Sequence, residues 1–296
     1  MIPEPIRDTI EPITGTILRA EVVGGGCIAH ATRVEAARGV FFLKWAEGEA
    51  GRTFEAEAEG LYALRVAATG LDLIIPQPLA SQNADAEPGF LLMEWIQPGR
   101  AQSEDWRCFG RALAALHRAK TFADEDGPYG YATDNWIGSK PQRNGWAESW
   151  PAFFGEKRLR AQAETVRELG AWNAAWNAPL NRLIERLVEI LPETPQPSLL
   201  HGDLWAGNAL AMADSRFALI DPAVYIGHRE ADLAMTELFG GFAPGFYEAY
   251  REAWPMQPGY PERREVYNLF HLINHLTHGP GYAGQVGRIL QRYGNS

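Results

Sequence analysis

Short runs of alternating apolar and polar residues, separated by turn residues, occupy the first part of the chain. ILRAEVV, CIAHATRVEA and VFFLKW follow one another up to residue 45, with a glycine turn after the first run and an Arg-Gly turn after the second. Because such runs are typical of half-buried strands, three antiparallel strands are predicted here. A further pair of strands is expected around residues 73–79 and 90–95.

Helical spacing of apolar residues first occurs at residues 54–69, where Thr53 is a possible N-cap. Pro98-Gly99 then breaks the chain, and helices dominate after it. Ser103 could cap the first of them, and further helices fit residues 153–169, 179–191, 229–238, 245–254 and 261–278. The pattern predicts an α+β protein with two lobes: a small antiparallel-sheet lobe at 1–97, a hinge near 94–98, and a mainly helical lobe at 98–296.

Composition agrees with an ordered protein of this size. The 296 residues, 46% of them hydrophobic, suffice for one large domain or two joined lobes. The formal charge of −10 disfavours nucleic acid and anionic membranes as partners. Only two cysteines are present, Cys27 and Cys108, which argues against a disulfide framework or a cysteine zinc site. Because no long apolar run or signal pattern is visible, a soluble, cytoplasmic protein is expected.

Two neighbouring motifs carry most of the candidate chemistry, HGDLWAGN at 201–208 and LIDPAVY at 219–225. Residues 209–212 and 217–220 fit a strand hairpin between them, so Asp203 and Asn208 would precede the hairpin and Asp221 would follow it. A phosphoryl-transfer site needs one carboxylate to orient the attacking hydroxyl, and an amide and a second carboxylate to hold the magnesium that bridges the phosphates. Each motif alone could be a plain turn. Both together around a hairpin favour a protein-kinase-like fold and site.

A glycine turn and a lysine in the first lobe fit the same chemistry. Gly24-Gly25-Gly26 lies between two predicted strands, where backbone amides could approach phosphate oxygens, although three glycines also make an ordinary turn. Lys44 ends the third strand, and a lysine on an apolar strand is costly unless it snorkels or pairs. In a kinase this lysine contacts the nucleotide phosphates and pairs with a helix glutamate. Glu57 is the first choice for that partner and Glu55 the second.

The strand FLLMEWI, residues 90–96, runs into the predicted hinge. In a kinase the adenine ring pairs with backbone groups at this place. The Glu94 carbonyl and the Ile96 amide are assigned to that pairing, and Met93 to the back of the pocket. An ordinary buried strand would have the same side chains, so this assignment depends on the kinase interpretation.

Two further groups of polar residues have candidate roles. His271, His275 and His278 share one face of a predicted helix and could hold a metal ion, but a hydrogen-bonded or solvated face is favoured because no cysteine lies nearby. Asp232, within READLAMTELF, is predicted to fix the 201–208 loop by accepting hydrogen bonds from its backbone amides.

Over nearly its whole length the chain resembles the fructosamine-3-kinase (ketoamine kinase) family, part of the wider aminoglycoside and choline kinase-like phosphotransferases. The resemblance is carried by GGGCIAHA, FFLKW, FEAEAEGL, LLHGDLWAGN, the segment YGYATDNWIGSKPQRNGWAESWPAFFGEKRLRAQ and the segment IDPAVYIGHREADLAMTELFGGF. Residues 135–139 and 221–242 are the most specific to the ketoamine branch. His228 departs from the family pattern, in which Asp is more usual.

The resemblance implies ATP-dependent phosphorylation of the third-carbon hydroxyl of sugars attached to amines as ketoamines, with Mg²⁺ as cofactor. The phosphorylated adduct falls apart and frees the amine, which amounts to deglycation repair of small amines or proteins. A monomer or homodimer is expected. Alternatives are an aminoglycoside or other small-molecule hydroxyl kinase and, from another class, a nucleotide-binding regulator without catalysis.

Positions carried over from the family give each candidate residue a role. Asp203 would be the catalytic base, Asn208 and Asp221 the magnesium ligands, and Lys44 with Glu57 the group that places the phosphates. Stacking on the sugar is assigned to Trp205 and Trp136, for which core packing is an equal alternative.

Cys27 follows the three glycines directly and is a candidate redox-sensitive position. Backbone amides around a phosphate-binding loop would favour its thiolate. A small residue tolerated for packing at the start of a strand is the alternative.

Overall fold

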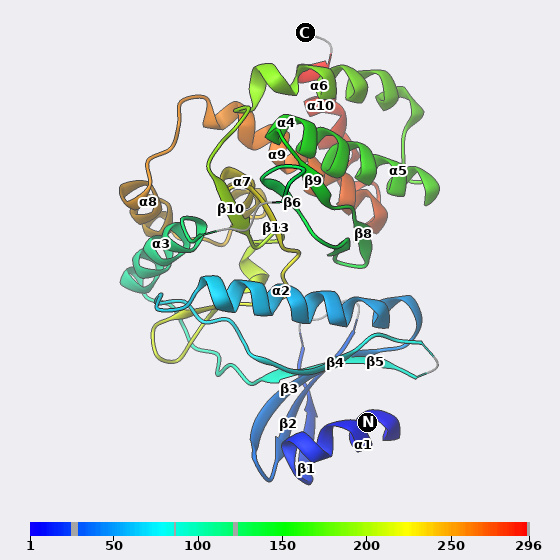
Figure 1. Cartoon of the computed structure of the whole chain (residues 1–296), viewed down its shortest axis with the longest axis vertical. Coiled ribbons are helices and arrows are strands. Elements are labelled where there is room, and N and C mark those ends of the chain that lie inside the picture. Colours follow the sequence, from blue (N-terminus) through cyan, green and yellow to red (C-terminus); the bar gives the residue numbers. More distant parts are fainter. Residues whose placement is uncertain (25–28, 86, 121–123, 295–296) are drawn as a thin grey trace.

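The computed structural model describes residues 1–24, 29–85, 87–120 and 124–294 (Figure 1). The first lobe contains an antiparallel sheet of order β1-β2-β3-β5-β4. Its elements are α1 (Glu4–Thr14), β1 (Ile17–Val22), β2 (His30–Ala36), β3 (Gly39–Ala46), α2 (Phe54–Ala67), β4 (Pro78–Gln82) and β5 (Gly89–Glu94). The three strands predicted at the start of the chain and the helix after them are therefore confirmed.

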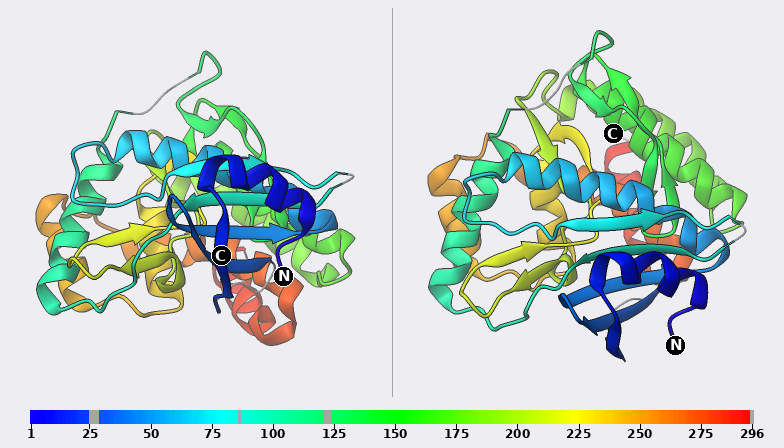
Figure 2. Two further views of the ribbon diagram at one scale, coloured as in Figure 1. Left: turned by 90° about the horizontal axis from the view of Figure 1, so that it is seen from below. Right: turned by 60° about the horizontal axis from the view of Figure 1, so that its bottom comes forward.

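Helix α1 was not predicted, although its spacing was visible in the sequence. Ile2, Ile6 and Ile10 recur every fourth residue and are buried against apolar side chains of the sheet, among them Val34 and Leu92. In Figure 2 α1 lies across the face of the sheet opposite to α2. Both faces of the small sheet are therefore covered by a helix.

The first strand of the second predicted pair begins later than expected. The sheet strand β4 starts at Pro78, and residues 73–77 are not part of the first-lobe sheet. Leu73 and Ile75 are buried in a core cluster shared with the second lobe, and Ile74 bridges to Ala218 there. The apolar run was thus a connection buried between the lobes rather than a strand of the first sheet.

The second lobe is mainly helical, with small sheets that support its loops. A sheet of order β10-β13-β6-β9 and two hairpins, β7-β8 and β11-β12, lie among the helices. The strands are β6 (Tyr129–Tyr131), β7 (Asn135–Ile137), β8 (Lys140–Gln142), β9 (Gly145–Ala147), β10 (Pro197–Leu200), β11 (Ala209–Ala211), β12 (Phe217–Leu219) and β13 (Tyr225–His228). The helices are α3 (Ser103–His117), α4 (Trp150–Phe153), α5 (Ala161–Glu168), α6 (Asn177–Ile190), α7 (Glu230–Leu238), α8 (Pro244–Ala253), α9 (Tyr260–His275) and α10 (Ala283–Gly294).

The predicted helices of this lobe are found with adjusted ends. The N-cap of α3 is Gln102, in a reciprocal capping box with Asp105, so Ser103 is the first helical residue rather than the cap. In the first lobe, Thr53 does stand before α2, but its hydroxyl donates to Ala50 O instead of capping the helix. The helix expected at 153–169 begins at Trp150 and includes a π-helical turn, Phe154–Arg160. Helix α10 was not predicted.

The two lobes share part of their core. One cluster of buried apolar side chains joins Leu61 and Leu64 of α2 and Leu91 of β5 to Phe109 of α3 and Phe217 of β12. In Figure 1, α2 accordingly lies between the sheet and the helical lobe. This common core sets the relative position of the strand and loops that carry the candidate site.

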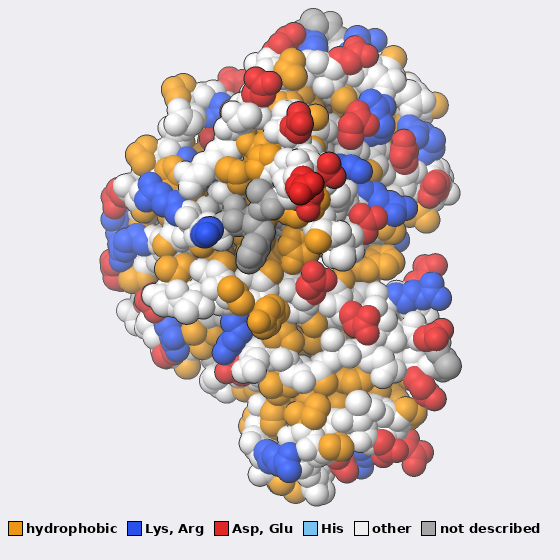
Figure 3. Space-filling view, in the orientation of Figure 1, with side chains coloured by type: hydrophobic (Ala, Val, Ile, Leu, Met, Phe, Trp, Pro, Cys, Tyr) orange, Lys and Arg blue, Asp and Glu red, His pale blue; other side chains and the backbone are white. Residues whose placement is uncertain are grey.

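Charged groups of both signs are interspersed over the face shown in Figure 3. None of the helices in the described ranges combines the length and apolar content needed to cross a bilayer.

Candidate active site

The HGD loop leaves β10 through a sharp turn that requires glycine. Gly202 has φ 82°, and a Cβ built there would lie 2.0 Å from Ala223 O. The amide of Ala223 donates to His201 O at 2.8 Å. A side chain at position 202 would therefore separate two segments, 201–203 and 221–224, that are hydrogen-bonded to each other.

Asp232 holds this turn from the lobe interior, as the sequence predicted. Its carboxylate accepts hydrogen bonds from the backbone amides of His201 at 2.7 Å and Gly202 at 2.9 Å. His117 lies 3.2 Å from the same carboxylate and contacts Tyr250 OH through its other nitrogen. Although burial opposes it, hydrogen bonding to these partners keeps the pKa of Asp232 below its ordinary value.

Asp203 and Asn208 face each other across the loop. The side-chain amide of Asn208 donates to Asp203 O at 2.9 Å and to Asp203 Oδ2 at 3.3 Å. Because its nitrogen is used in this way, Asn208 has its carbonyl oxygen available for a cation. Burial, followed by the nearby charge of Asp221, raises the pKa of Asp203 to about 7.

Asp221 directly follows the hairpin, in a backbone conformation that is unusual for a residue with a side chain. Its φ is 55°, and among the described residues Ser215 is the other non-glycine with positive φ. Asn208 O accepts a hydrogen bond from the Ile220 amide at 3.1 Å, which places the start of this segment beside Asn208. The backbone therefore brings the two predicted metal-binding residues to neighbouring positions.

Lys44 connects the first lobe to this site. Its Nζ lies 2.8 Å from Glu57 Oε1 and forms a short ion pair with Asp221 Oδ1. Burial alone would lower the pKa of Lys44, but the charges of Asp221 and Glu57 outweigh it and raise that pKa above the ordinary value. Glu55, the second candidate, instead bonds Asn83 through its side chain at 2.8 Å. The geometry thus agrees with Glu57 as the partner of Lys44.

His201 has a structural part in the loop that the sequence did not assign. Its Nε2 lies 2.9 Å from Ile220 O, and its Nδ1 accepts from the Asp203 amide at 3.3 Å. Burial lowers the pKa of His201, which favours the neutral ring that these two contacts need. The histidine therefore ties the Asp203 turn to the residue before Asp221.

The hinge residues and the glycine turn are placed only in part. Met93 and Ile96 are buried, and the Glu94 backbone amide and carboxylate both bond the Gln77 backbone. Gly24 follows the end of β1, whereas Gly25, Gly26 and Cys27 lie outside the described residues. Their predicted roles in nucleotide binding and redox sensitivity stay predictions.

The two candidate tryptophans differ in their surroundings. Trp205 is 41% exposed, beside Asp203, with its ring so close to Gly207 that a Cβ there would lie 2.2 Å from it. Trp136 is half-buried on β7, opposite Pro141 of β8. Of the two tryptophans, Trp205 is therefore the one that lies in the HGD loop with an exposed ring.

The three candidate histidines differ: His275 is hydrogen-bonded, His271 is buried with its Nδ1 unpartnered among the described residues, and His278 lies beyond the end of α9 and is exposed. His275 Nδ1 lies 2.8 Å from His271 O, and His271 is buried. Within the described ranges, no group of three or more His, Cys, Asp or Glu side chains could hold a metal ion. Magnesium needs no such group, because it is usually bound by one or two protein carboxylates together with substrate phosphates and waters. The oxygen donors of Asn208 and Asp221 fit that mode.

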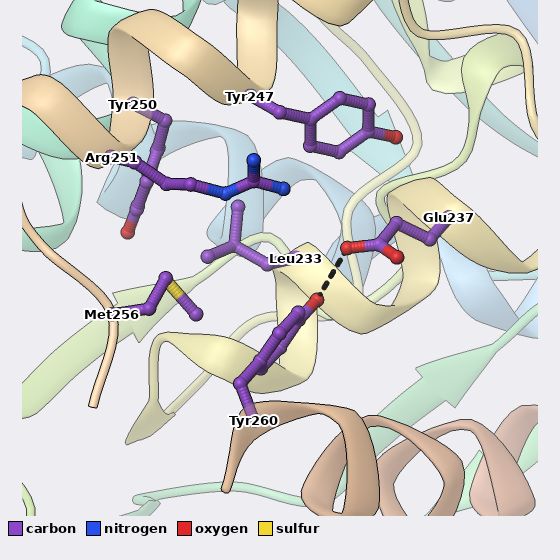
Figure 4. Close-up of a pocket in the computed structure, with 7 residues that line it drawn as sticks. All are labelled: Leu233, Glu237, Tyr247, Tyr250, Arg251, Met256 and Tyr260. Atoms are coloured by element: carbon purple, nitrogen blue, oxygen red, sulfur yellow. Dashed lines mark hydrogen bonds between the residues drawn. The ribbon is translucent and has the colours of Figure 1, made fainter. Parts of the chain in front are cut away.

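A small pocket lies away from this site, between α7, α8 and α9 (Figure 4). Its volume is about 10 Å³, which is roughly one water molecule. Tyr260 donates to Glu237 across it at 2.7 Å. This pocket is too small for a nucleotide or a sugar and does not change the assignment of the site.

Comparison with known proteins supports the same interpretation. The fructosamine kinase family model matches residues 6–295. A probable ketoamine kinase of Synechocystis sp. is 36% identical over 98% of this chain and 96% of its own length. The chloroplastic protein-ribulosamine 3-kinase of Arabidopsis thaliana is 34% identical over 99% of this chain and 88% of its own length.

Solved structures confirm the predicted two-lobed, protein-kinase-like fold. A structure described as a fructosamine-3-kinase of Thermobifida fusca has a TM-score of 0.84 at 28% identity, covering 98% of this chain and 99% of that one. The aminoglycoside phosphotransferase APH(4)-Ia, solved with AMP-PNP and hygromycin B, has a TM-score of 0.65 at 13% identity, covering 97% and 96%, and so shares the fold. From the family match and the identity with these relatives over nearly the whole chain, the protein belongs to the fructosamine kinase family and is an ATP-dependent kinase.

Proposed function

We propose that this kinase uses ATP and Mg²⁺ to phosphorylate a sugar hydroxyl of ketoamines, and that it serves deglycation repair. Family membership and the names of the relatives support the substrate class. The observation that carries the proposal is the contact of Lys44 with both Glu57 and Asp221 beside the HGD loop. A strand lysine, a helix glutamate and a loop aspartate in contact are the parts that a kinase uses to place nucleotide phosphates.

In the proposed reaction Asp203 is the catalytic base. Its carboxylate orients the sugar hydroxyl and accepts the proton as the hydroxyl oxygen attacks the γ-phosphorus of ATP. The bond from that phosphorus to the bridging oxygen breaks, and ADP leaves. Lys44, positioned by Glu57, would balance the negative charge of the phosphates.

Asn208 and Asp221 are the proposed ligands of Mg²⁺, through their carbonyl and carboxylate oxygens. Bound there, the cation would neutralise charge that develops between the β- and γ-phosphates. Gly24, Gly25 and Gly26 are proposed to cover the phosphates. The backbone of Glu94 and Ile96 would bind adenine with Met93 behind it, and Trp205 would stack on the sugar; Trp136 is the weaker candidate because its strand pairing accounts for its position.

The remaining assignments are predictions from the sequence. They are a cytoplasmic location, a monomer or homodimer, a small or protein-bound ketoamine as the substrate, and no nucleic-acid or membrane partner. The alternative is an aminoglycoside or other small-molecule hydroxyl kinase, since a kinase-like fold serves those substrates too.

A substrate panel tests the proposal. Purified enzyme is assayed for ADP release with ribulose-, erythrulose- and fructose-amines, aminoglycosides and choline, with Mg²⁺ and with EDTA. Ketoamines should have the highest kcat/KM, and only with Mg²⁺. The matched control is an analogue of the best ketoamine that lacks the third-carbon hydroxyl. With this analogue the enzyme should release no ADP above background. An equal or higher kcat/KM for an aminoglycoside would move the function to the alternative.

A further inference from the structure

The β7-β8 hairpin, the turn after it and the π-helical turn Phe154–Arg160 place a layer of buried polar side chains beneath residues 221–224. Asn135, Gln142, Asn144 and Arg158 are each at most 6% exposed. Buried polar groups of this kind are retained at a cost unless they are hydrogen-bonded. Asn135 and Gln142 donate hydrogen bonds to the backbone of the segment that follows Asp221.

The amides cap two successive carbonyls of that segment. Asn135 Nδ2 donates to Val224 O at 2.8 Å, and Gln142 Nε2 donates to Ala223 O at 2.9 Å. Gln142 Nε2 also donates to Asn135 Oδ1 at 2.8 Å, so the two caps are linked to each other. Residues 221–224 belong to no strand or helix, and these side chains therefore replace the partners that a sheet would supply.

A second tier fixes the amides themselves. Asn144 Nδ2 donates to Asn135 Oδ1 at 3.1 Å, and Arg158 Nη2 donates to Asn144 Oδ1 at 2.8 Å. The Arg158 guanidinium lies 3.9 Å from the centre of the Tyr225 ring, directly after the segment. The π-helical turn around Arg158 aims this side chain into the lobe.

The opposite side of the segment is also closed. Ala223 donates to His201 O, and its own carbonyl abuts Gly202. A Cβ on Gly60 of α2 would lie 3.2 Å from Pro222 and 3.4 Å from Val224, so this helix packs tightly on the segment. Gly60 lies three residues after Glu57 on the same helix face, which links the segment to the partner of Lys44.

We infer that Asn135 and Gln142 are positioning residues that hold the 221–224 segment so that Asp221, in its left-handed conformation, meets Lys44 and the metal bound with the nucleotide. A strained residue keeps its conformation only where the surroundings over-determine it, and the two caps supply that constraint from beneath. The inference rests on the proposed function in taking Asp221 as a ligand of Mg²⁺.

The test measures how much Mg²⁺ improves nucleotide binding. ADP is titrated by calorimetry into the whole protein in EDTA and in Mg²⁺. The Kd in EDTA divided by the Kd in Mg²⁺ is then compared between variants. Gln142→Met removes the donors at nearly constant volume. It should lower the ratio about fivefold or more, while the Kd in EDTA stays within about twofold of the original protein.

Gln162→Met is the matched control. Gln162 is equally buried, in the same lobe, and donates to Asn274 Oδ1 at 2.9 Å, with no bond to residues 221–224 among its described contacts. It should lose stability to a similar extent and keep the original ratio. If Gln142→Met does not fold, Asn135→Ala replaces it, because it removes the cap on Val224.

Each outcome decides a separate point. The positioning role is overturned if Gln142→Met keeps the Kd ratio of the original protein, or if Gln162→Met lowers that ratio as much as Gln142→Met does. In either case the proposed function still stands. If the ADP affinity of the unsubstituted protein does not respond to Mg²⁺ at all, the metal assignment of the proposed function is contradicted, and the inference is overturned with it.

Discussion

The two lobes contribute to the candidate site by different means. The first lobe supplies Lys44 from a strand and Glu57 from a helix, joined by one side-chain ion pair whose members are each 13% exposed. The second lobe supplies Asp203, Asn208 and Asp221 from loops. Those loops are held by hydrogen bonds with buried side chains: backbone amides donate to Asp232, and the Gln142 amide donates to a backbone carbonyl.

This difference separates activity from stability. Lys44 also pairs with Asp221, so a conservative change at Glu57 leaves the lysine one charged partner and should alter nucleotide binding more than the fold of the first lobe. Loop carbonyls and amides that bond to buried groups are part of the core, so changes beneath the second-lobe loops should also cost stability.

Asp203→Asn is expected to have the largest effect. It should lower kcat at least about 100-fold, because it removes the proposed base while keeping the shape of the side chain. The Kd for ADP and the free energy of unfolding should change little. Turnover on the best ketoamine and a denaturant titration are the measurements. Near-normal turnover would contradict the role of Asp203.

Gly202→Ala should cost about 2 kcal/mol or more of stability, from the left-handed backbone and the contact with Ala223 O. Gly170→Ala is the matched control, because Gly170 has φ 72° and a Cβ there would meet nothing within 4 Å. Chemical denaturation of both variants isolates the contact. Equal losses would show that the 201–203 and 221–224 segments are less tightly joined than their hydrogen bonds indicate.

Acid should destabilise the second lobe through its buried histidines. Burial, followed by the charges of Arg229 and Arg263, lowers the pKa of His228 to about 3. The unfolded chain takes up this proton below about pH 6.5, whereas the folded chain does not until near pH 3. Stability should therefore fall as the pH drops through that window, by up to about 1.4 kcal/mol per pH unit for each such histidine.

The variant His228→Gln tests this slope. The unfolding free energy of this variant, measured between pH 7.5 and 5, should depend on pH less steeply than that of the original protein. Toward pH 5 the difference in slope should correspond to close to one proton. His228 also contacts Tyr267 OH at 2.8 Å, so a uniform loss at all pH values is expected in addition. An unchanged slope would show that the ring takes up a proton in the folded protein.

Glu57→Gln should have the smallest effect, a rise of about fivefold in the KM for MgATP, since Lys44 keeps Asp221 and can still bond the amide. Glu55→Gln is the control two residues away, where the side chain bonds Asn83. It should leave the KM unchanged. Similar KM values for both variants would mean that the Lys44–Glu57 pair does not set the phosphate position.

Local sequence signals predicted the parts of the fold that depend on local physics. Alternation identified β1 to β3, helical spacing identified α2 and most later helices, and the residues flanking the β11-β12 hairpin were recognised. Some elements were missed. The apolar repeat of α1 rests on three isoleucines in a segment that contains Pro12. Strands β6 to β9 are three residues each, too short for alternation to show. Residues 73–75 are apolar because Leu73 and Ile75 are buried in the core that the two lobes share.

The sequence by itself determined the family, the fold and the identity of the chemical groups, because these follow from residue types at fixed spacings along the chain. The tertiary structure decided which of those groups meet. The choice of Glu57 over Glu55 depends on which face of α2 looks toward β3, and the support of Asp221 depends on amides some eighty residues earlier, such as Asn135. Hydrogen bonds between distant segments leave no periodic signal along the chain, so only the folded arrangement reveals them.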